Sequence, residues 1–157
     1  MSEKYTFQDF LASVDGENQK FVSELHDELT AFGCKIDVKS AKSGYVVSYS
    51  LDKKIIANYV FRKKGLIARI YAAHVDQYPE ILDTLPGSMV RTIQESPNCK
   101  RLADPSTCNQ RCSMGYDFLL QGERLQKCRS NAFMFLLDEE SRPYVKSLLL
   151  HEVKAAV

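Results

Sequence analysis

Hydrophobic and polar residues alternate with two different periods along this chain, and the change of period separates predicted helices from predicted strands. Near the N-terminus, apolar residues recur at spacings of three and four: Phe21, Val22, Leu25, Leu29 and Phe32. Such spacing places them on one face of a helix. We therefore predict a helix over Gly16–Phe32, ended by Gly33 in a left-handed conformation. A shorter helix over Thr6–Val14 precedes it, with Thr6 and Asp9 spaced as a capping box.

From Cys34 the period changes to two, which is typical of half-buried strands. Short connections containing Gly, Asp or Lys separate four such segments: Cys34–Lys39, Tyr45–Leu51, Ile55–Phe61 and Leu66–Ala73. Consecutive strands joined by short turns pair as an antiparallel meander. The middle of the chain is therefore predicted to be a sheet.

The remainder predicts further helices, one loop and a second group of strands. In chain order these are helices over His74–Leu85 and Gly87–Glu95, a loop over Ser96–Met114, strands over Tyr116–Gln121 and Arg124–Leu137, and a helix from Asp138. Asp138 is a good N-cap, and Pro143 is tolerated in a first helical turn. The predicted fold is one α+β domain over residues 1–157, with an antiparallel sheet of about six strands and helices mainly on one face.

Composition restricts the class of protein further. The chain has 157 residues, 45% hydrophobic and 26% charged, as in soluble globular domains. No apolar run approaches the roughly 18 residues that a membrane span needs, so no membrane role is predicted. The N-terminus lacks the apolar segment of a signal peptide, which favours a cytoplasmic protein. In that reducing compartment, clustered cysteines are more often metal ligands or redox groups than disulfides.

Four of the five cysteines lie close together in the sequence: Cys99, Cys108, Cys112 and Cys128. Cys108 and Cys112 are separated by three residues, which is within the range of a zinc knuckle. Lysine and arginine residues flank the four sulfurs and favour the thiolate form. The loop contains little to bury, so metal ligation would supply the energy that orders it. We therefore predict a structural zinc site formed by these four thiolates within residues 96–130.

Other interpretations of the cysteines stay open. Cysteine is often a small buried apolar residue, and Cys34 fits this role because it is in phase with Ile36 and Val38. The same four thiolates suit an iron–sulfur cluster, although nothing in the sequence selects one. Cys108 and Cys112 are also candidates for a redox pair, but their spacing is not that of thioredoxin-like proteins. A closed four-thiolate site leaves no open metal position for catalysis.

A second hypothesis is a small-molecule sensor or an enzyme that uses the Tyr/Arg/Lys face of the sheet. Tyr49, Tyr59 and Arg69 lie on adjacent predicted strands and are candidates for lining a pocket. His74, near Asp76, is the histidine that we select as a candidate general base, although a capping or surface role explains it too. The period of two also places Tyr49 among core residues, which is the interpretation we favour.

A third hypothesis is nucleic-acid binding, which rests on an uneven distribution of charge. The net charge is only +1, but residues 39–69 contain eight Lys and Arg against one acidic residue, Asp52. Such a region is typical of an anion-binding surface, and equally of solvated turns and strand edges. The second interpretation is favoured, so nucleic acid is a possible partner rather than the expected one. The sequence identifies no substrate or partner.

Two segments resemble known families. The stretch Tyr45-Val-Val-Ser-Tyr-Ser, followed by Lys54-Ile-Ile-Ala-Asn-Tyr-Val-Phe-Arg-Lys-Lys-Gly65, resembles small uncharacterised bacterial domains, including the iron-chaperone-like group, over residues 16–95. The segments Cys108-Asn-Gln-Arg-Cys112-Ser-Met-Gly-Tyr-Asp-Phe and Gln126-Lys-Cys128-Arg are similar to cysteine-containing hypothetical proteins of Gram-positive bacteria. The resemblance implies an α+β fold with an antiparallel sheet. It implies no established activity and carries over no catalytic residues.

Overall fold

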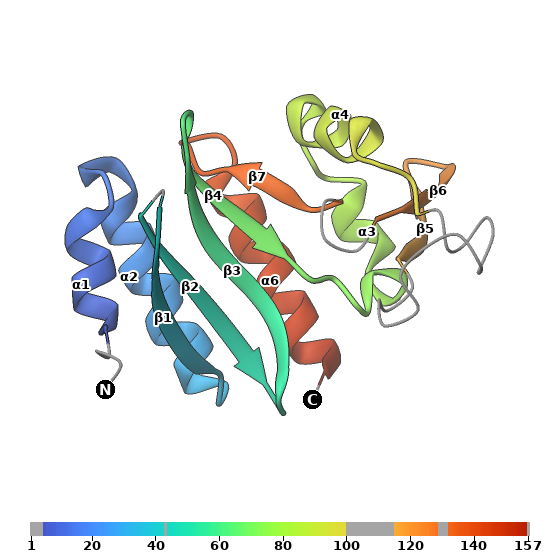
Figure 1. The fold of residues 1–157 in the computed structure, drawn as a ribbon. Helices are drawn as coiled ribbons and strands as arrows, with labels where there is room; N and C mark the ends of the chain where they lie inside the picture. Colours follow the sequence, from blue (N-terminus) through green and yellow to red (C-terminus); the bar gives the residue numbers. More distant parts are fainter. Residues whose placement is uncertain (1–4, 43, 100–114, 129–131, 157) are drawn as a thin grey trace.

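The computed structural model describes residues 5–42, 44–99, 115–128 and 132–156. In chain order they form α1 (Phe7–Ser13), α2 (Gly16–Ala31), β1 (Lys35–Ala41), β2 (Gly44–Leu51), β3 (Lys54–Arg62), β4 (Gly65–Ile70), the 3-10 helix η1 (Val75–Gln77), α3 (Pro79–Leu82), α4 (Gly87–Glu95), β5 (Tyr116–Leu120), β6 (Glu123–Lys127), β7 (Met134–Leu136) and α6 (Arg142–Ala156). This arrangement confirms the predicted α+β class (Figure 1). None of the described helices is both long enough and apolar enough to cross a membrane.

The strands divide between two antiparallel sheets. Five form one sheet in the order β1-β2-β3-β4-β7, and β5 and β6 form a separate hairpin. The single strand predicted over Arg124–Leu137 is therefore wrong. The chain leaves the hairpin at Cys128, whose backbone N–H donates to Pro97 O at 2.8 Å, and Ile70 donates to Phe133 O at 2.8 Å as β7 joins β4. An apolar pattern places side chains on faces, but it does not specify which strand supplies the hydrogen bonds.

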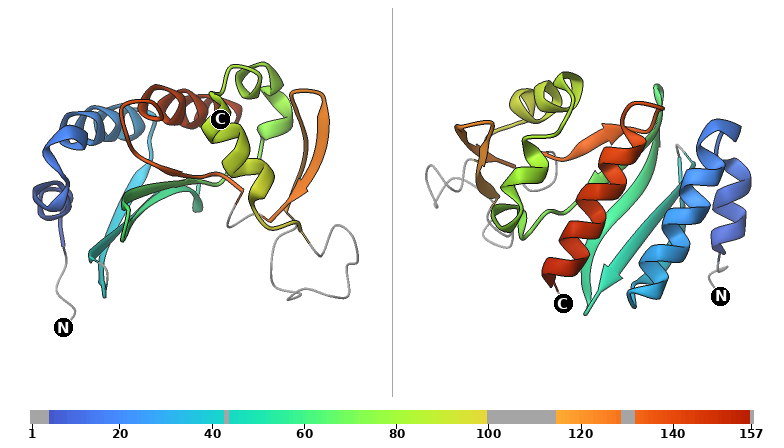
Figure 2. Two further views of the ribbon diagram at one scale, coloured as in Figure 1. Left: turned by 90° about the horizontal axis from the view of Figure 1, so that it is seen from above. Right: turned by 180° about the vertical axis from the view of Figure 1, so that it is seen from behind.

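Two long helices cover one face of the five-stranded sheet. α2 and α6 lie side by side there, and α1 lies beside α2 at the outer edge (Figure 2). Their buried residues include Val22, Leu25 and Leu29 from α2, and Val145, Leu148, Leu149 and Val153 from α6. Gly33 follows α2 with φ +99°, which is the left-handed conformation predicted for it. The opposite face of the sheet, here named the open face, carries none of the described helices.

The β5–β6 hairpin joins the sheet through aromatic packing. The Phe133 ring lies 5.5 Å from the ring of Tyr116, 5.5 Å from that of Phe118 and 6.4 Å from that of Phe135, measured between centroids. Tyr116 and Phe118 come from the inner face of β5, whereas Phe135 belongs to β7. These rings connect the hairpin to the apolar core that the helices and the sheet share.

The helical stretch predicted over His74–Leu85 is divided at Pro79, where a boundary or kink is expected from the proline. A 3-10 turn over Val75–Gln77 comes first, and the α3 helix begins only at Pro79. Tyr78 between them has φ −137° and ψ 53°, outside the helical region. Proline lacks an N–H and disfavours a helical conformation in the residue before it, which explains the interruption.

Candidate functional site

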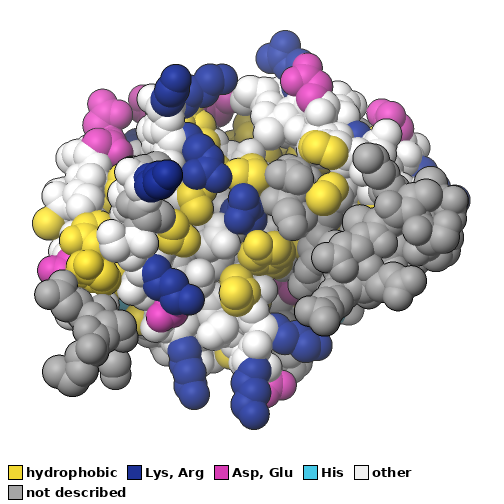
Figure 3. Space-filling view, in the orientation of Figure 1, with side chains coloured by type: hydrophobic (Ala, Val, Ile, Leu, Met, Phe, Trp, Pro, Cys, Tyr) yellow, Lys and Arg dark blue, Asp and Glu magenta, His cyan; other side chains and the backbone are white. Residues whose placement is uncertain are grey.

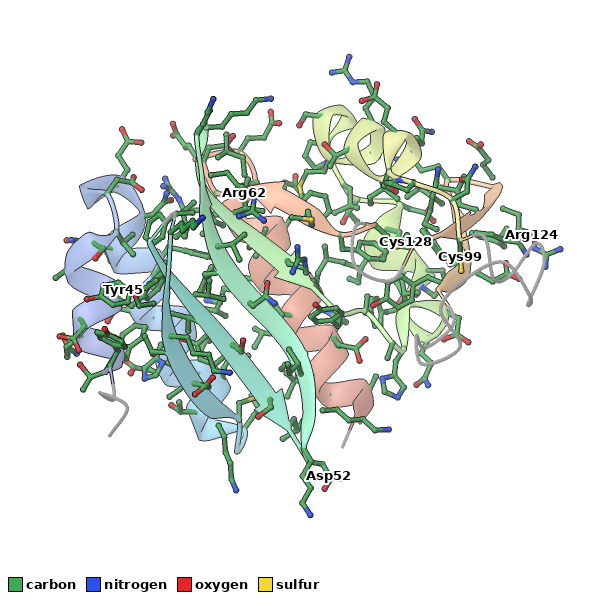
Figure 4. The ribbon with its side chains drawn as sticks, viewed as in Figure 1. Tyr45, Asp52, Arg62, Cys99, Arg124 and Cys128 are labelled. Carbon is green, nitrogen blue, oxygen red and sulfur yellow. The ribbon has the colours of Figure 1, made fainter. Side chains whose placement is uncertain are left out.

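Two of the four predicted zinc ligands lie on paired segments of backbone. Cys99 donates its N–H to Gln126 O at 2.9 Å, and Cys128 donates to Pro97 O at 2.8 Å, around an antiparallel bridge between Asn98 and Lys127. Cys99 and Cys128 are thus diagonal neighbours on one face of the pairing, where such residues lie about 7–8 Å apart. Figure 4 shows them beside each other where α4 ends and β6 ends.

Gly115 closes over the Cys99 sulfur. Its backbone N–H donates to Cys99 Sγ at 3.3 Å. A Cβ atom at position 115 would lie 2.2 Å from Lys127 O and 2.9 Å from Cys99 Sγ. Only glycine allows the backbone to approach so closely, so this contact depends on the absence of a side chain.

A buried lysine holds the same segments from the other face of β6. Lys127 is 5% exposed, and its Nζ donates to Gln94 O at 2.7 Å, Ser96 O at 3.0 Å and Asn98 Oδ1 at 3.0 Å. Gln94 lies in the last turn of α4, where the negative end of the helix dipole favours a cation. Lys127 therefore fixes the chain leading to Cys99 against the strand leading to Cys128.

Cys108 and Cys112 lie outside the described residues, so the structure tests only half of the predicted ligand set. Within the described ranges, no group of three or more His, Cys, Asp or Glu side chains is placed to hold a metal ion. The zinc site and the alternative iron–sulfur cluster therefore stay predictions. Cys34 is buried beside β1, and burial raises the pKa of its thiol, as befits a core residue.

The second set of candidates, Tyr49, Tyr59, Arg69 and His74, does not form a single pocket. Tyr49 and Tyr59 are 1% and 3% exposed and contact each other with ring centroids 6.2 Å apart, facing the helices. Burial raises the pKa of both phenols. Arg69 lies on the open face, because it pairs with Asn58 and Met134 rather than with the residues opposite the tyrosines. The core interpretation of the two tyrosines is confirmed.

His74 has a partner that sequence reasoning missed, the carboxylate of Glu152. Glu152 is 1% exposed, and its Oε1 accepts from the His74 backbone N–H at 2.9 Å and from the Tyr78 hydroxyl at 2.8 Å. Its Oε2 lies 2.6 Å from His74 Nδ1. Burial first, and then the charge of Glu152, raise the pKa of Tyr78, so this phenol stays protonated and donates.

The sequence did contain a signal for Glu152. It lies three and four residues after Leu149 and Leu148, which places an acidic residue on the inward face of the last helix. A buried carboxylate needs hydrogen-bond donors, and its partners come from the β4–η1 connection. With Nδ1 of His74 directed at Glu152, the half-exposed imidazole keeps Nε2 for acid–base chemistry or for a ligand.

Three comparisons with known proteins were made for this chain. A scan against protein-family models, a search of curated proteins and a search of solved structures each found no match. The resemblance to uncharacterised bacterial domains therefore stays a prediction from the sequence.

Proposed function

We propose that this chain is a metal-stabilised binding protein in which zinc, held by Cys99, Cys108, Cys112 and Cys128, has a structural role. The observation that carries the proposal is the position of Cys99 and Cys128 on one face of paired segments, with the Gly115 N–H on the Cys99 sulfur. The first and the last cysteine of the cluster, Cys99 and Cys128, then supply thiolates to a common site, and the other two come from the chain between them.

The chemistry of the donor set favours zinc. Thiolates are soft ligands that select zinc or iron–sulfur clusters, and a closed site of four thiolates is typical of structural zinc. Lys127, whose ammonium is bound by Gln94 O, Ser96 O and Asn98 Oδ1, holds together the two segments that carry Cys99 and Cys128. A cytoplasmic location belongs to the same proposal, because the thiols have to stay reduced to bind metal.

The test is metal analysis of protein purified without added metal. We expect about one zinc per chain by mass spectrometry of the elements, and a tetrahedral thiolate spectrum after exchange with cobalt(II). Cys99→Ser and Cys128→Ser should each lose most of the bound metal. Cys34→Ser is the matched control, because this buried thiol lies in the core beside β1, and it should keep full metal content.

Three results would overturn the proposal. Protein that contains only trace metal and five freely titratable thiols would show that the cysteines bind no metal. Equal metal loss in the Cys34 control and in the Cys99 and Cys128 variants would show that folding, and not ligation, controls metal content. A broad visible absorbance with iron and sulfide in the protein would replace zinc by an iron–sulfur cluster.

An acid–base role for His74 is a second candidate function, and it is favoured by the contact with Glu152. A buried carboxylate that holds Nδ1–H fixes the tautomer of the imidazole and leaves Nε2 as the basic nitrogen. This is how histidine general bases are oriented in enzymes. The substrate class is not specified by these residues.

Selective modification tests the second candidate. Diethyl pyrocarbonate acylates a neutral imidazole nitrogen, and peptide mass spectrometry locates the modified residue. We expect His74 to react faster than His26, whose Nδ1 contacts Tyr49 Oη and whose ring stacks on Phe7. Glu152→Gln should change the rate of the His74 reaction, because the carboxylate that orients the ring is lost, and leave the rate of the His26 reaction unaltered. An unchanged His74 rate in this variant would contradict the proposed orientation.

A further inference from the structure

The open face of the five-stranded sheet is built as a mixed apolar and basic surface. Register and alternation place on it the side chains of Val46, Ser48, Asn58, Val60, Ile67, Arg69, Met134 and Leu136. The helices α2 and α6 lie on the other side of the sheet (Figure 2). Apolar side chains on a face without a covering helix are typical of surfaces that bind another molecule.

Two polar groups at the centre of this face are buried without partners. Asn58 and Arg69 are directly opposite each other in the pairing of β3 with β4. Asn58 is 8% exposed, and neither its Oδ1 nor Arg69 Nε has a hydrogen-bond partner in the described structure. Among the described residues, Arg69 Nη2 contacts the Met134 sulfur at 3.7 Å. A buried acceptor and a buried donor left unpaired are each costly, so their positions indicate a ligand that satisfies both.

The charge of the open face is positive. Lys35, Lys39, Arg62 and Arg69 fall on it, against the single acidic residue Asp37, which is itself 3.6 Å from Lys39 Nζ. Figure 3 looks onto this side and shows Lys and Arg side chains among hydrophobic ones. No carboxylate of the described chain pairs with Arg69. A partner with acidic and apolar side chains would match this surface.

We propose that the open face binds an acidic, partly apolar polypeptide segment of a partner protein, centred on Arg69 and Asn58. A partner carboxylate pairs with the Arg69 guanidinium, and a peptide N–H donates to Asn58 Oδ1. A peptide group supplies the N–H donor that this acceptor needs, whereas an ionised phosphate group supplies none. The apolar residues between the charges likewise match side chains and not a sugar–phosphate backbone.

The proposal does not depend on the proposed zinc site, whose cysteines Cys99 and Cys128 lie where α4 and β6 end (Figure 4). Its test uses the full chain and short fluorescent peptides in which Glu and Val alternate, with a Lys and Val peptide as the counterpart. Fluorescence anisotropy should show tighter binding of the acidic peptide by about tenfold or more. Arg69→Met should weaken that binding by about tenfold, the expected loss of one charge-assisted pair.

Controls separate binding from folding. Arg91→Met removes an exposed arginine of α4, away from the open face, and should bind the acidic peptide like the wild type. Arg69→Met should keep the wild-type circular dichroism spectrum and metal content. Asn58→Asp, which adds a negative charge beside Arg69, should weaken binding of the acidic peptide in the same direction.

Three outcomes would overturn the proposal. Equal affinity for the acidic and the basic peptide would show that the basic residues of the open face do not select an acidic partner. Equal affinity of a correctly folded Arg69→Met variant and the wild type for the acidic peptide would show that Arg69 does not bind this peptide. Tighter binding of single-stranded DNA than of the acidic peptide, lost in Arg69→Met, would assign the face to a nucleic acid instead.

Discussion

Two parts of the molecule are stabilised in different ways. One part, the helix-covered sheet, comprises α1, α2, β1–β4, β7 and α6, and its side chains Leu25, Leu29, Val47 and Leu148 are at most 1% exposed. The other, the hairpin region, comprises η1, α3, α4, residues 96–99 and 115, β5 and β6. It rests on the Phe133 ring on one side. On the other side it depends on backbone pairing at the cysteines and on Lys127.

The difference indicates which substitutions should affect each part. Apolar burial is spread over many side chains, each contributing about 1.5–3 kcal/mol when fully buried. The contacts around Cys99, by contrast, are few and specific, and each requires one particular residue. Changes in the core should therefore lower global stability without altering metal content, whereas changes around Cys99 should alter metal content first.

The largest effect is expected for Leu148→Ala in the helix-covered sheet. Leu148 is fully buried between α6 and the sheet, and removing a buried leucine leaves a cavity that costs about 2–5 kcal/mol. Urea denaturation followed by circular dichroism measures the change. Leu119→Ala is the control, because Leu119 is 55% exposed on the hairpin and should cost far less. Metal content per folded chain should be unchanged in both variants, and a loss in Leu148→Ala would contradict the separation.

Gly115→Ala, unlike Leu148→Ala, should lower the metal content of the folded chain. Its methyl group would overlap with Lys127 O and Cys99 Sγ, so the backbone has to move and the N–H contact to sulfur is lost. Overpacking of this kind costs about 1–3 kcal/mol, and we expect most of the metal to be lost as well. Gly16→Ala is the matched control, because its Cβ would meet no atom within 4 Å. Full metal binding by Gly115→Ala would show that the contact is dispensable.

Local patterning was enough to predict most of the helix-covered sheet. The stripe of α2, the capping box of α1 and the meander of β1–β4 follow from periods of 3.6 and 2 within short windows. The prediction failed where pairing is long-range, because β7 leaves the hairpin and joins β4. The sequence pattern of residues 124–137 contains no information about that partner, since alternation is the same in either sheet.

The sites were predicted less completely, for a related reason. The cysteines were visible as a cluster in the sequence, and pairing of the backbone brings Cys99 and Cys128 to one face. Glu152 is separated from His74 by 78 positions along the chain, and only the tertiary fold joins them. Asn58 and Arg69 became notable only as buried groups without partners, which no pattern of residue types records.

Lys127→Met tests the polar attachment of the hairpin region and should have a smaller effect than Gly115→Ala. Methionine keeps the apolar stem but leaves Gln94 O, Ser96 O and Asn98 Oδ1 without this donor, at a cost of about 1–2 kcal/mol. Amide hydrogen exchange should accelerate in α4 and β6 while α2 stays protected. Lys154→Met, at the exposed end of α6, should change neither. Faster exchange in α2 alone would contradict the assignment of Lys127 to the hairpin region.

The smallest effect expected is a pH dependence inside the helix-covered sheet. His26 stacks on Phe7 with ring centroids 3.7 Å apart and contacts Tyr49 Oη at 2.9 Å through Nδ1. Burial lowers the pKa of His26, and Asp27 opposes this shift only in part. The unfolded chain therefore binds the proton first as the pH falls. Stability should decrease from about pH 6.5, the ordinary histidine value, down to the lowered pKa of the folded state, and then level off.

His26→Gln measures this contribution, because glutamine does not titrate in the same range. Urea denaturation at a series of pH values should show a shallower loss of stability in the variant than in the wild type between about pH 6.5 and the lowered pKa. His151→Gln, on the outer part of α6, keeps His26 and should therefore keep that part of the slope. Parallel curves for the wild type and His26→Gln would mean that the buried contact with Tyr49 tolerates a protonated imidazole. In that case lowering the pH would not destabilise the helix-covered sheet through His26. The Leu148→Ala and Gly115→Ala variants would then be the ones that distinguish the helix-covered sheet from the hairpin region.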